Sequence, residues 1–268
     1  MTQQQVIINP KRLLIIAGSD SGGGAGIQGD IKTAHMHGVY ASTAITALTA
    51  QNTEGVSGIF DITANFVAEQ IGMVLSDIGA DVIKIGMLNK SAVISAVHTE
   101  IHDKNIPIVL DTVMVAKGGA PLLADNAVSA MKNKLVPLAK IVTPNIPEAE
   151  ILTGMEIRKM DDMIKAAKAL IEMGAEWALV KGGHIKGDAV FDVIVGKKKF
   201  EVFSGEKIPS KNTHGTGCTM ATAIACNLAY GMDVIPAVEK ARDYIRRAIL
   251  AAPMIGNGHG PVNHFIPV

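Results

Sequence analysis

Short apolar runs alternate with amphipathic segments along almost the whole chain of 268 residues. The runs have the length of strands buried on both faces, and the segments between them carry apolar residues at helical spacing. Strands are predicted at 13–17, 40–48, 81–86, 106–111, 140–145 and 177–183, and a hairpin at 189–203. Helices are predicted from about residue 29 and at 63–78, 91–102, 125–136, 160–174, 217–229 and 235–251. Repeated strand–helix units predict an α/β fold with a mostly parallel central sheet and helices on both faces.

The predicted sheet also indicates where a ligand would bind. In open sheets of this class, ligands lie beyond the carboxyl ends of the strands. The loops of interest therefore follow residues 17, 48, 86, 111, 143 and 181.

Composition limits the domain organisation and the partners. Apolar residues make up 48% of the chain and charged residues 19%, which favours a buried core over disorder. No linker or repeat divides the sequence, so we expect one domain over residues 1–268, with residues 1–11 as a flexible extension. The 25 basic residues equal the 25 acidic ones, so no overall field attracts nucleic acid or an anionic membrane.

The two cysteines and the hydropathy pattern predict a cytoplasmic protein. Cys218 and Cys226 are eight residues apart in a predicted helix, too far along its axis for a disulfide. No signal peptide is recognised at the N-terminus, and no run of about 18 apolar residues predicts a membrane span.

A glycine-rich segment, "GSDSGGGAGIQGD", follows the first predicted strand at residues 18–30. Gly24, Gly26 and Gly29 satisfy the spacing G-x-G-x-x-G of dinucleotide-binding loops, but the acidic residue that should follow about 20 residues later is missing. Two other interpretations remain open at this point. The glycines allow a tight turn, or they bring the backbone close to a small ligand with Asp20 or Asp30 as a polar contact.

A second glycine segment, "NTHGTGC", precedes a run of small and apolar residues typical of a closely packed helix. Free amides at a helix start and the helix dipole form an anion site, and Gly215 and Gly217 would let a phosphate approach the backbone. Cys218 would then lie at the helix N-terminus, where the pKa of a thiol is lowered. An ordinary helix start with a small buried thiol explains the same spacing.

A set of motifs occurs in a fixed order: "AGSDSGGGAGIQGDIKT", "ITALTAQNTEGV", "KIGML", "VLDTVMVAKGG", "TPNIPEAE", "VKGGH", "NTHGTGC" and a terminal "GHGPVNHF". The ordered set resembles the hydroxymethylpyrimidine/phosphomethylpyrimidine kinases of thiamine biosynthesis, within the ribokinase superfamily. The resemblance covers residues 12 to about 265. It implies a ribokinase-like three-layer α/β/α fold, ATP as co-substrate, Mg²⁺, and a homodimer.

The resemblance also implies a reaction. Enzymes of this family transfer the γ-phosphoryl group of ATP to 4-amino-5-hydroxymethyl-2-methylpyrimidine, and then phosphorylate that monophosphate to the diphosphate. By resemblance, the amides of Gly215, Thr216, Gly217 and Cys218 form the anion hole for the transferred group. Many superfamily members have an Asp at the last position of this motif, where it serves as the general base. Here the expected base is Cys218, as a thiolate favoured by the helix terminus.

Further roles for single residues follow from the resemblance. Lys181, Asn145 and Thr213 are expected to bind ATP. Asp111 and Glu148 are expected to hold Mg²⁺, partly through water, because this ion prefers oxygen ligands. Glu148 also stands in the first turn of a predicted helix, where acidic residues are favoured in any case.

The pyrimidine site is expected to combine hydrogen-bonding groups with apolar walls. Asp30 could accept from the exocyclic amine, and the Gln51 amide offers both a donor and an acceptor. By resemblance, the lining includes Gly18, Ala25, Thr49 and Met87. The position of Thr49 is often apolar in relatives, so its contact is a weaker inference.

Several remaining residues carry weaker predictions. Lys117 could meet a phosphate of the second-step substrate, and His184 and His214 adjoin motif loops, with His214 beside the anion loop. His98 and His102 have a metal-capable spacing, but Thr99 replaces the glutamate of H-E-x-x-H.

Two alternatives to the pyrimidine kinase stay open. A pyridoxal or pyridoxine kinase would use the same cysteine motif on a vitamin B6 alcohol. A non-catalytic pyrimidine-binding protein would keep the fold without turnover.

Overall fold

The computed structural model describes residues 9–114, 125–183 and 189–268. Its strands form one nine-stranded sheet in the order β3-β2-β1-β4-β5-β6-β7-β8-β9. The strands are β1 (Arg12–Asp20), β2 (Tyr40–Gln51), β3 (Val56–Asp61), β4 (Val82–Ile85), β5 (Ile108–Leu110), β6 (Ile141–Val142), β7 (Trp177–Lys181), β8 (Ala189–Gly196) and β9 (Phe200–Glu206). The six central strands, β2, β1, β4, β5, β6 and β7, pair in parallel. The strands β3, β8 and β9 add antiparallel pairs at the two edges.

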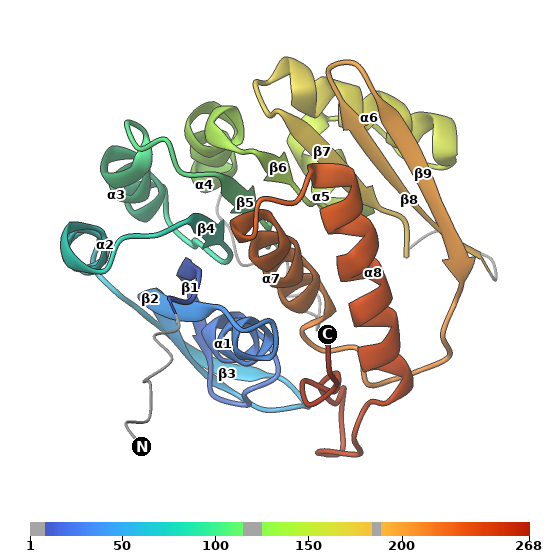
Figure 1. Cartoon of the computed structure of the whole chain (residues 1–268), viewed down its shortest axis with the longest axis horizontal. Coiled ribbons are helices and arrows are strands. Elements are labelled where there is room, and N and C mark those ends of the chain that lie inside the picture. The colour runs from blue at the N-terminus through green and yellow to red at the C-terminus, as the bar shows by residue number, and fades with distance from the viewer. Residues whose placement is uncertain (1–8, 115–124, 184–188) are drawn as a thin grey trace, which may run out of the picture.

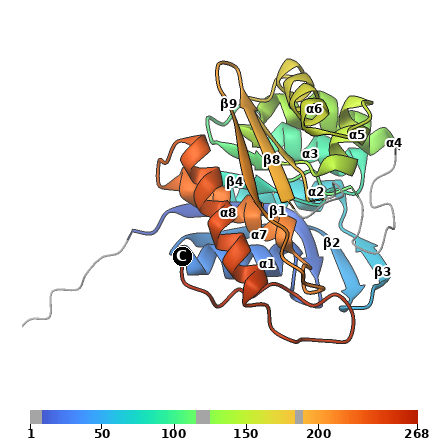
Figure 2. The ribbon, with the colours of Figure 1, turned by 90° about the vertical axis from the view of Figure 1, so that its right-hand side faces the viewer.

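Helices cover both faces of the sheet (Figures 1 and 2). One face packs against α1 (Gly26–Met36), α7 (Thr216–Ala229) and α8 (Val234–Leu250). The other face packs against α2 (Ala64–Asp77), α3 (Ser91–Ile101), α4 (Asp125–Ala130), α5 (Ile146–Thr153) and α6 (Met160–Glu172). The predicted three-layer α/β/α fold is therefore confirmed.

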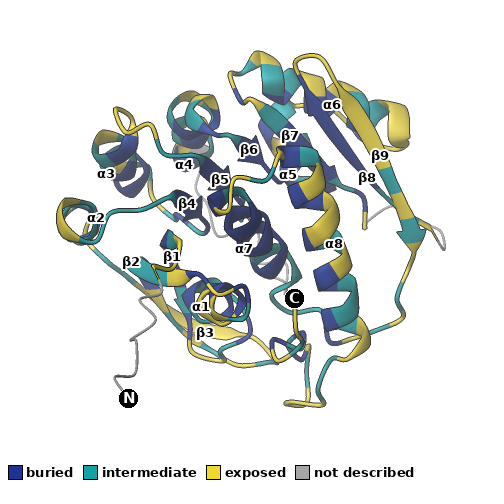
Figure 3. Cartoon of the chain, in the orientation of Figure 1, coloured by how far each residue is buried: buried dark blue, intermediate teal, exposed yellow. Residues whose placement is uncertain are grey.

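The strand β1 shows how the sequence builds these layers. Successive side chains of a strand point to opposite faces. Leu13 and Ile15 accordingly join the core under α1, α7 and α8, whereas Leu14 and Ile16 join the core under the other helices. All four side chains are fully buried, as the uninterrupted apolar run predicts for a central parallel strand. Figure 3 shows comparable burial, in dark blue, along α7, which packs on the sheet.

Two local differences from the predicted elements have physical reasons. The strand β3 was not expected, because most of its side chains are exposed and its antiparallel backbone pairing with β2 leaves little hydropathy signal. The helix predicted at 125–136 divides into α4, a π-helical turn (Met131–Leu135) and a 3-10 turn (Val136–Leu138), with Pro137 in the last. A proline lacks the N–H that a regular helix would need there.

Within the described ranges, no helix is both long and apolar enough to cross a membrane. Lys117 and His184 lie outside the described residues, so their predicted contacts are not addressed.

Candidate active site

A cavity of about 470 Å³ opens at the carboxyl ends of the parallel strands, where β1, β4, β5 and β7 meet the start of α7. Its position follows the rule for open parallel sheets. Fourteen of the residues expected to bind substrate, nucleotide or metal line it: Gly18, Ala25, Thr49, Gln51, Met87, Asp111, Asn145, Glu148, Lys181, Thr213, Gly215, Thr216, Gly217 and Cys218. Residues far apart in the sequence thus share one cavity.

Asp30 is the exception among the expected site residues. Its side chain is fully buried and is not part of the cavity wall. One carboxylate oxygen lies 2.8 Å from Lys84 Nζ, and the other accepts a 2.7 Å hydrogen bond from the Thr222 hydroxyl. Both carboxylate oxygens thus have partners within the protein. The prediction that Asp30 accepts a hydrogen bond from the pyrimidine amine is therefore wrong for this structure.

The carboxylate that organises the first glycine loop is Asp20. Its oxygens accept backbone hydrogen bonds from Gly22, Gly24 and Ala25 at 2.8–3.1 Å. His214 adds a fourth contact, with Nε2 2.7 Å from Asp20 Oδ2. Although burial favours the neutral acid, these hydrogen bonds hold the pKa of Asp20 below its ordinary value. The ionised carboxylate of Asp20 therefore fixes the conformation of the loop by accepting hydrogen bonds from its backbone.

The two glycine loops touch each other. Gly215 has φ +80°, and a Cβ at this position would lie 1.8 Å from the carbonyl oxygen of Gly24. A Cβ on Gly24 would in turn lie 2.6 Å from the ring of His214. Only glycine fits these close approaches, which bring the loop after β1 against the loop before α7.

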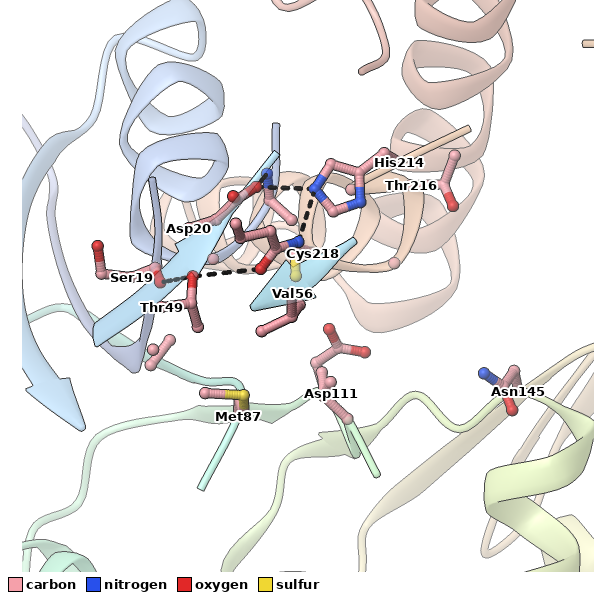
Figure 4. Close-up of a pocket in the computed structure, with 18 of the residues that line it drawn as sticks. Ser19, Asp20, Thr49, Val56, Met87, Asp111, Asn145, His214, Thr216 and Cys218 are labelled. Atoms are coloured by element: carbon pink, nitrogen blue, oxygen red, sulfur yellow. Dashed lines mark hydrogen bonds and ion pairs between the residues drawn. The ribbon is translucent and has the colours of Figure 1, made fainter. Parts of the chain in front are cut away.

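His214, Gln51 and Thr49 form a hydrogen-bonded wall of the cavity. Figure 4 labels Thr49 and His214 at its two ends. The Thr49 hydroxyl donates to the carbonyl oxygen of Ser19 at 2.8 Å, so its oxygen is free to accept from the Gln51 amide 3.2 Å away. The orientation of a glutamine amide is assigned from its partners. Gln51 Oε1 lies 3.2 Å from Thr49 Oγ1, and Gln51 Nε2 lies 3.4 Å from His214 Nε2, whose N–H donates to Asp20. Exchanging the two amide atoms gives each a matching partner, with the NH₂ group donating to Thr49 and the oxygen facing the Nε2–H of His214.

The helix α7 begins directly at the cavity. Gly215 is its N-cap residue, and a glycine has no side chain with which to cap the first amides. The residues after it are small, which lets α7 pack closely under β1, β4 and β5. Uncapped amides and the positive end of the helix dipole make this a site for an anion.

Cys218 is half-buried at this helix start and lines the cavity. Burial raises the pKa of its thiol to about 12, and Lys84 acts in the opposite direction. The expectation that the helix terminus alone favours a thiolate is therefore not met, because desolvation of the sulfur outweighs it.

Asp111, Lys181 and Glu148 also line the cavity, and Figure 4 shows Asp111 and Asn145 there. Lys181 Nζ is 3.3 Å from Asp111 Oδ1. Although burial opposes its charge, Asp111 and Glu148 raise the pKa of Lys181. Asn145 and Glu148 form a reciprocal capping box at the start of α5, so the helix-start role considered for Glu148 is real.

Asp111 and Glu148 are the candidate magnesium ligands of the cavity. Oδ2 of Asp111 is buried and has no hydrogen-bond partner among the described residues. The described part of the chain holds no cluster of three or more metal-ligating His, Cys, Asp or Glu side chains. Magnesium does not need such a cluster, because it binds through one or two carboxylates, water and substrate phosphates. Asp111 and Glu148 fit that requirement.

Lys84 and Asp20 are the polar residues of the site that the sequence reasoning missed or left undecided. Lys84 is fully buried in β4 and lines the cavity. A lysine in the middle of the apolar run "VIKI" is a signal that could have identified it, since lysine is almost never buried without a partner.

Comparison with known proteins shows the family to which the chain belongs. Residues 20–263 match the family model described as phosphomethylpyrimidine kinase. The hydroxymethylpyrimidine/phosphomethylpyrimidine kinase of Bacillus subtilis is 44% identical over 95% of this chain and 94% of its own length. A thiamine biosynthesis bifunctional protein of Geobacter sulfurreducens is 51% identical over 95% of this chain, which spans only 52% of that protein.

A solved structure resembles almost the whole chain. The ADP complex of Bacillus subtilis pyridoxal kinase has a TM-score of 0.89 and 36% identity, over 96% of this chain and 98% of the kinase. Likeness to a vitamin B6 kinase in structure and to pyrimidine kinases in sequence agrees with the shared set of motifs. The family model covers most of the chain, and on this ground the chain belongs to the phosphomethylpyrimidine kinase family.

Proposed function

We propose that the chain is a kinase that transfers the γ-phosphoryl group of ATP to 4-amino-5-hydroxymethyl-2-methylpyrimidine, and then phosphorylates the monophosphate to the diphosphate. The observation that carries this proposal is the contact between the two glycine loops at Gly24 and Gly215. This contact puts a hydrogen-bonding wall and an anion site into one cavity. Phosphoryl transfer depends mainly on such positioning and on electrostatic stabilisation.

The wall formed by Gln51 and Thr49 suits an aminopyrimidine. With its NH₂ group toward Thr49, the Gln51 amide can donate to a ring nitrogen and accept from the exocyclic amine. Met87 and Val56 supply apolar surface in the same cavity. Gly18 leaves space that Met87 fills, because a Cβ there would lie 2.4 Å from the Met87 methyl group.

The opposite end of the cavity suits the phosphates. The uncapped amides at the start of α7 would stabilise the charge of the transferred group. Lys181 and Asn145, with Thr213, would bind the nucleotide phosphates. Asp111 and Glu148 would hold Mg²⁺, which neutralises phosphate charge when it is bound.

Cys218 is proposed as the acceptor of the substrate's hydroxyl proton. It lines the cavity between the pyrimidine wall and the phosphate end. Its raised pKa means that only a small fraction is thiolate at neutral pH, so proton removal would depend on nearby positive charge.

A pyridoxal or pyridoxine kinase is the second candidate, favoured by the likeness to pyridoxal kinase of Bacillus subtilis. Both candidates use a heteroaromatic alcohol with a hydroxymethyl group. They differ in the ring substituents that the wall at Gln51 would contact.

One assay separates the candidates. The purified protein is incubated with Mg²⁺, ATP and either the pyrimidine alcohol, its monophosphate or pyridoxine, and the products are identified by mass spectrometry. We expect turnover of the alcohol and diphosphate from the monophosphate. Exclusive turnover of pyridoxine would contradict the proposal, and binding without turnover would indicate a non-catalytic protein.

The variant Gln51→Leu tests the contact with the pyrimidine ring in the same assay. It removes both hydrogen-bonding groups of the amide and leaves the phosphate end intact. Because a site that hydrogen-bonds its substrate discriminates strongly, we expect KM for the pyrimidine to rise by roughly 10-fold or more while KM for ATP stays nearly constant. Unchanged pyrimidine kinetics would show that Gln51 does not hydrogen-bond to the pyrimidine ring.

We also propose that the protein forms a homodimer through β2 and β3. Leu48 and Phe60 are paired across the two strands and are 42% and 68% exposed. Apolar side chains at a sheet edge favour association. Sedimentation is expected to give twice the chain mass of 28.1 kDa, and Phe60→Lys is expected to give the monomer mass. A monomeric wild-type protein at micromolar concentration would contradict the dimer.

A further inference from the structure

Lys84 and Asp30 form a buried ion pair in the middle of the fold. Lys84 Nζ lies 2.8 Å from Asp30 Oδ2, and both side chains are fully buried. Although burial opposes its charge, Asp30 raises the pKa of Lys84, so the ammonium persists. Desolvating two charges costs several kcal/mol, and apolar side chains of similar size often stabilise a fold as well or better. The pair therefore points to a role beyond stability.

The pair lies directly beneath the start of α7. Thr222, which donates a 2.7 Å hydrogen bond to Asp30, follows Cys218 by four residues in this helix. Residues at this spacing lie on one face of a helix, one turn apart. Lys84 and Cys218 line the cavity, whereas Asp30 does not. The positive end of the ion pair is thus the end at the cavity.

Charged groups from four elements act on Cys218. They are Lys84 in β4, Asp30 in α1, Asp111 after β5 and Lys181 at the end of β7. Burial raises the pKa of the thiol most strongly, and Asp30 and Asp111 raise it further. Among these groups, Lys84 gives the largest contribution in favour of the thiolate, and the backbone N–H of Gly26 acts in the same direction.

We propose that Lys84 is a positioning residue for phosphoryl transfer, whose ammonium, paired with Asp30, stabilises the thiolate of Cys218. This inference rests on the proposed function and deepens it. The thiolate, having lost its proton to solvent, accepts the proton of the substrate's hydroxyl group. The hydroxyl oxygen forms a bond to the γ-phosphorus, the bond from that phosphorus to the ADP oxygen breaks, and the thiol later returns its proton to solvent.

The test measures the reactivity of Cys218 without substrates. Iodoacetamide alkylation is followed at pH 8 by mass spectrometry of the peptide that contains Cys218. The double variant Lys84→Met/Asp30→Asn removes both charges and leaves no unpaired ion. The pKa of the Cys218 thiol is lowered more by Lys84 than it is raised by Asp30. We therefore expect the loss of both charges to raise this pKa and to slow alkylation by roughly twofold or more. An unchanged rate would overturn the inference.

The single variant Asp30→Asn isolates the lysine. It keeps Lys84, whose charge Asp111 also favours, and removes the carboxylate that disfavours the thiolate, so alkylation of Cys218 is expected to be faster than in the double variant. A merely structural role predicts similar changes in both variants. If Asp30→Asn slowed alkylation as much as the double variant, the electrostatic role of Lys84 would be wrong.

Two controls report on packing. Thr222→Val removes the hydroxyl hydrogen bond but keeps both charges, so the alkylation rate is expected to stay close to that of the wild type. A loss as large as that of the double variant would contradict the inference. Cys226 is fully buried in the same helix, and faster alkylation there would reveal loosened structure. A slowing at Cys218 with no change at Cys226 supports the inference.

The proposed function can fail separately from this inference. Alkylation needs neither ATP nor pyrimidine, so a Lys84 effect on Cys218 can be present or absent whether or not the wild-type protein phosphorylates a pyrimidine. Where both hold, the double variant is expected to lower kcat about as strongly as it slows alkylation, with KM for ATP nearly unchanged.

Discussion

Replacing Cys218 by alanine is expected to lower turnover by roughly 10²- to 10⁴-fold, the contribution of a well-positioned general base. Alanine keeps the backbone N–H at this position, so the anion site at the start of α7 stays complete and only the sulfur is lost. The affinity for ATP should therefore remain nearly unchanged. Steady-state kinetics of the pyrimidine kinase reaction, together with ATP titration of the variant, measure the two effects.

The pH profile sharpens this prediction. Because the pKa of the thiol is raised to about 12, the thiolate fraction of the free enzyme increases with pH throughout the neutral range. Wild-type kcat/KM is expected to rise by up to about tenfold per pH unit there, and the alanine variant should lose this slope.

Cys226→Ala is the matched control for Cys218→Ala. Cys226 lies in the same helix but is fully buried in the core formed with α1 and α8. Its replacement leaves a small cavity and is expected to lower the free energy of unfolding by roughly 1 kcal/mol, with normal turnover. Near-normal turnover of Cys218→Ala would exclude the proposed base.

Hydropathy periodicity was sufficient to predict most of the fold. Central strands such as β1 are buried on both faces, so their apolar runs are visible without structural information. Edge strand β3 was missed because its pairing with β2 depends on backbone hydrogen bonds rather than on buried side chains. Periodicity likewise does not distinguish α4 from the π-helical turn that follows it.

The site was predicted less completely, because sequence order does not reveal which face of an element a polar side chain occupies. Asp30 belongs to a motif that reaches the cavity, yet its place in α1 turns it toward Lys84 and Thr222. Lys84 is in the short motif "KIGML", but its burial depends on the pairing of β4 with β1 and β5, where it is in register with Ile15 and Val109. Such pairings between distant residues need tertiary structure.

Replacing Gly215 by alanine is expected to lower turnover by roughly 10²- to 10³-fold, the range for loss of an oxyanion-hole donor. The residue has φ +80°, where alanine is strained by about 1 kcal/mol. The larger effect is steric, because the new Cβ would lie 1.8 Å from the carbonyl oxygen of Gly24. The two glycine loops would have to separate, which would displace the first amides of α7. Steady-state kinetics and thermal unfolding measure both consequences.

Gly231→Ala separates backbone strain from the clash. Gly231 follows the other end of α7 with φ +81°, nearly the same as Gly215, and apart from its chain neighbours no atom of the described residues lies within 4 Å of the Cβ position. We expect Gly231→Ala to lower the free energy of unfolding by a similar backbone-strain contribution and to keep full activity. If Gly215→Ala retained the activity of Gly231→Ala, close contact between the loops would not be required for turnover. A loss confined to Gly215→Ala would instead mean that the pyrimidine wall and the phosphate end work only when Gly24 and Gly215 touch, since both variants carry the same strain.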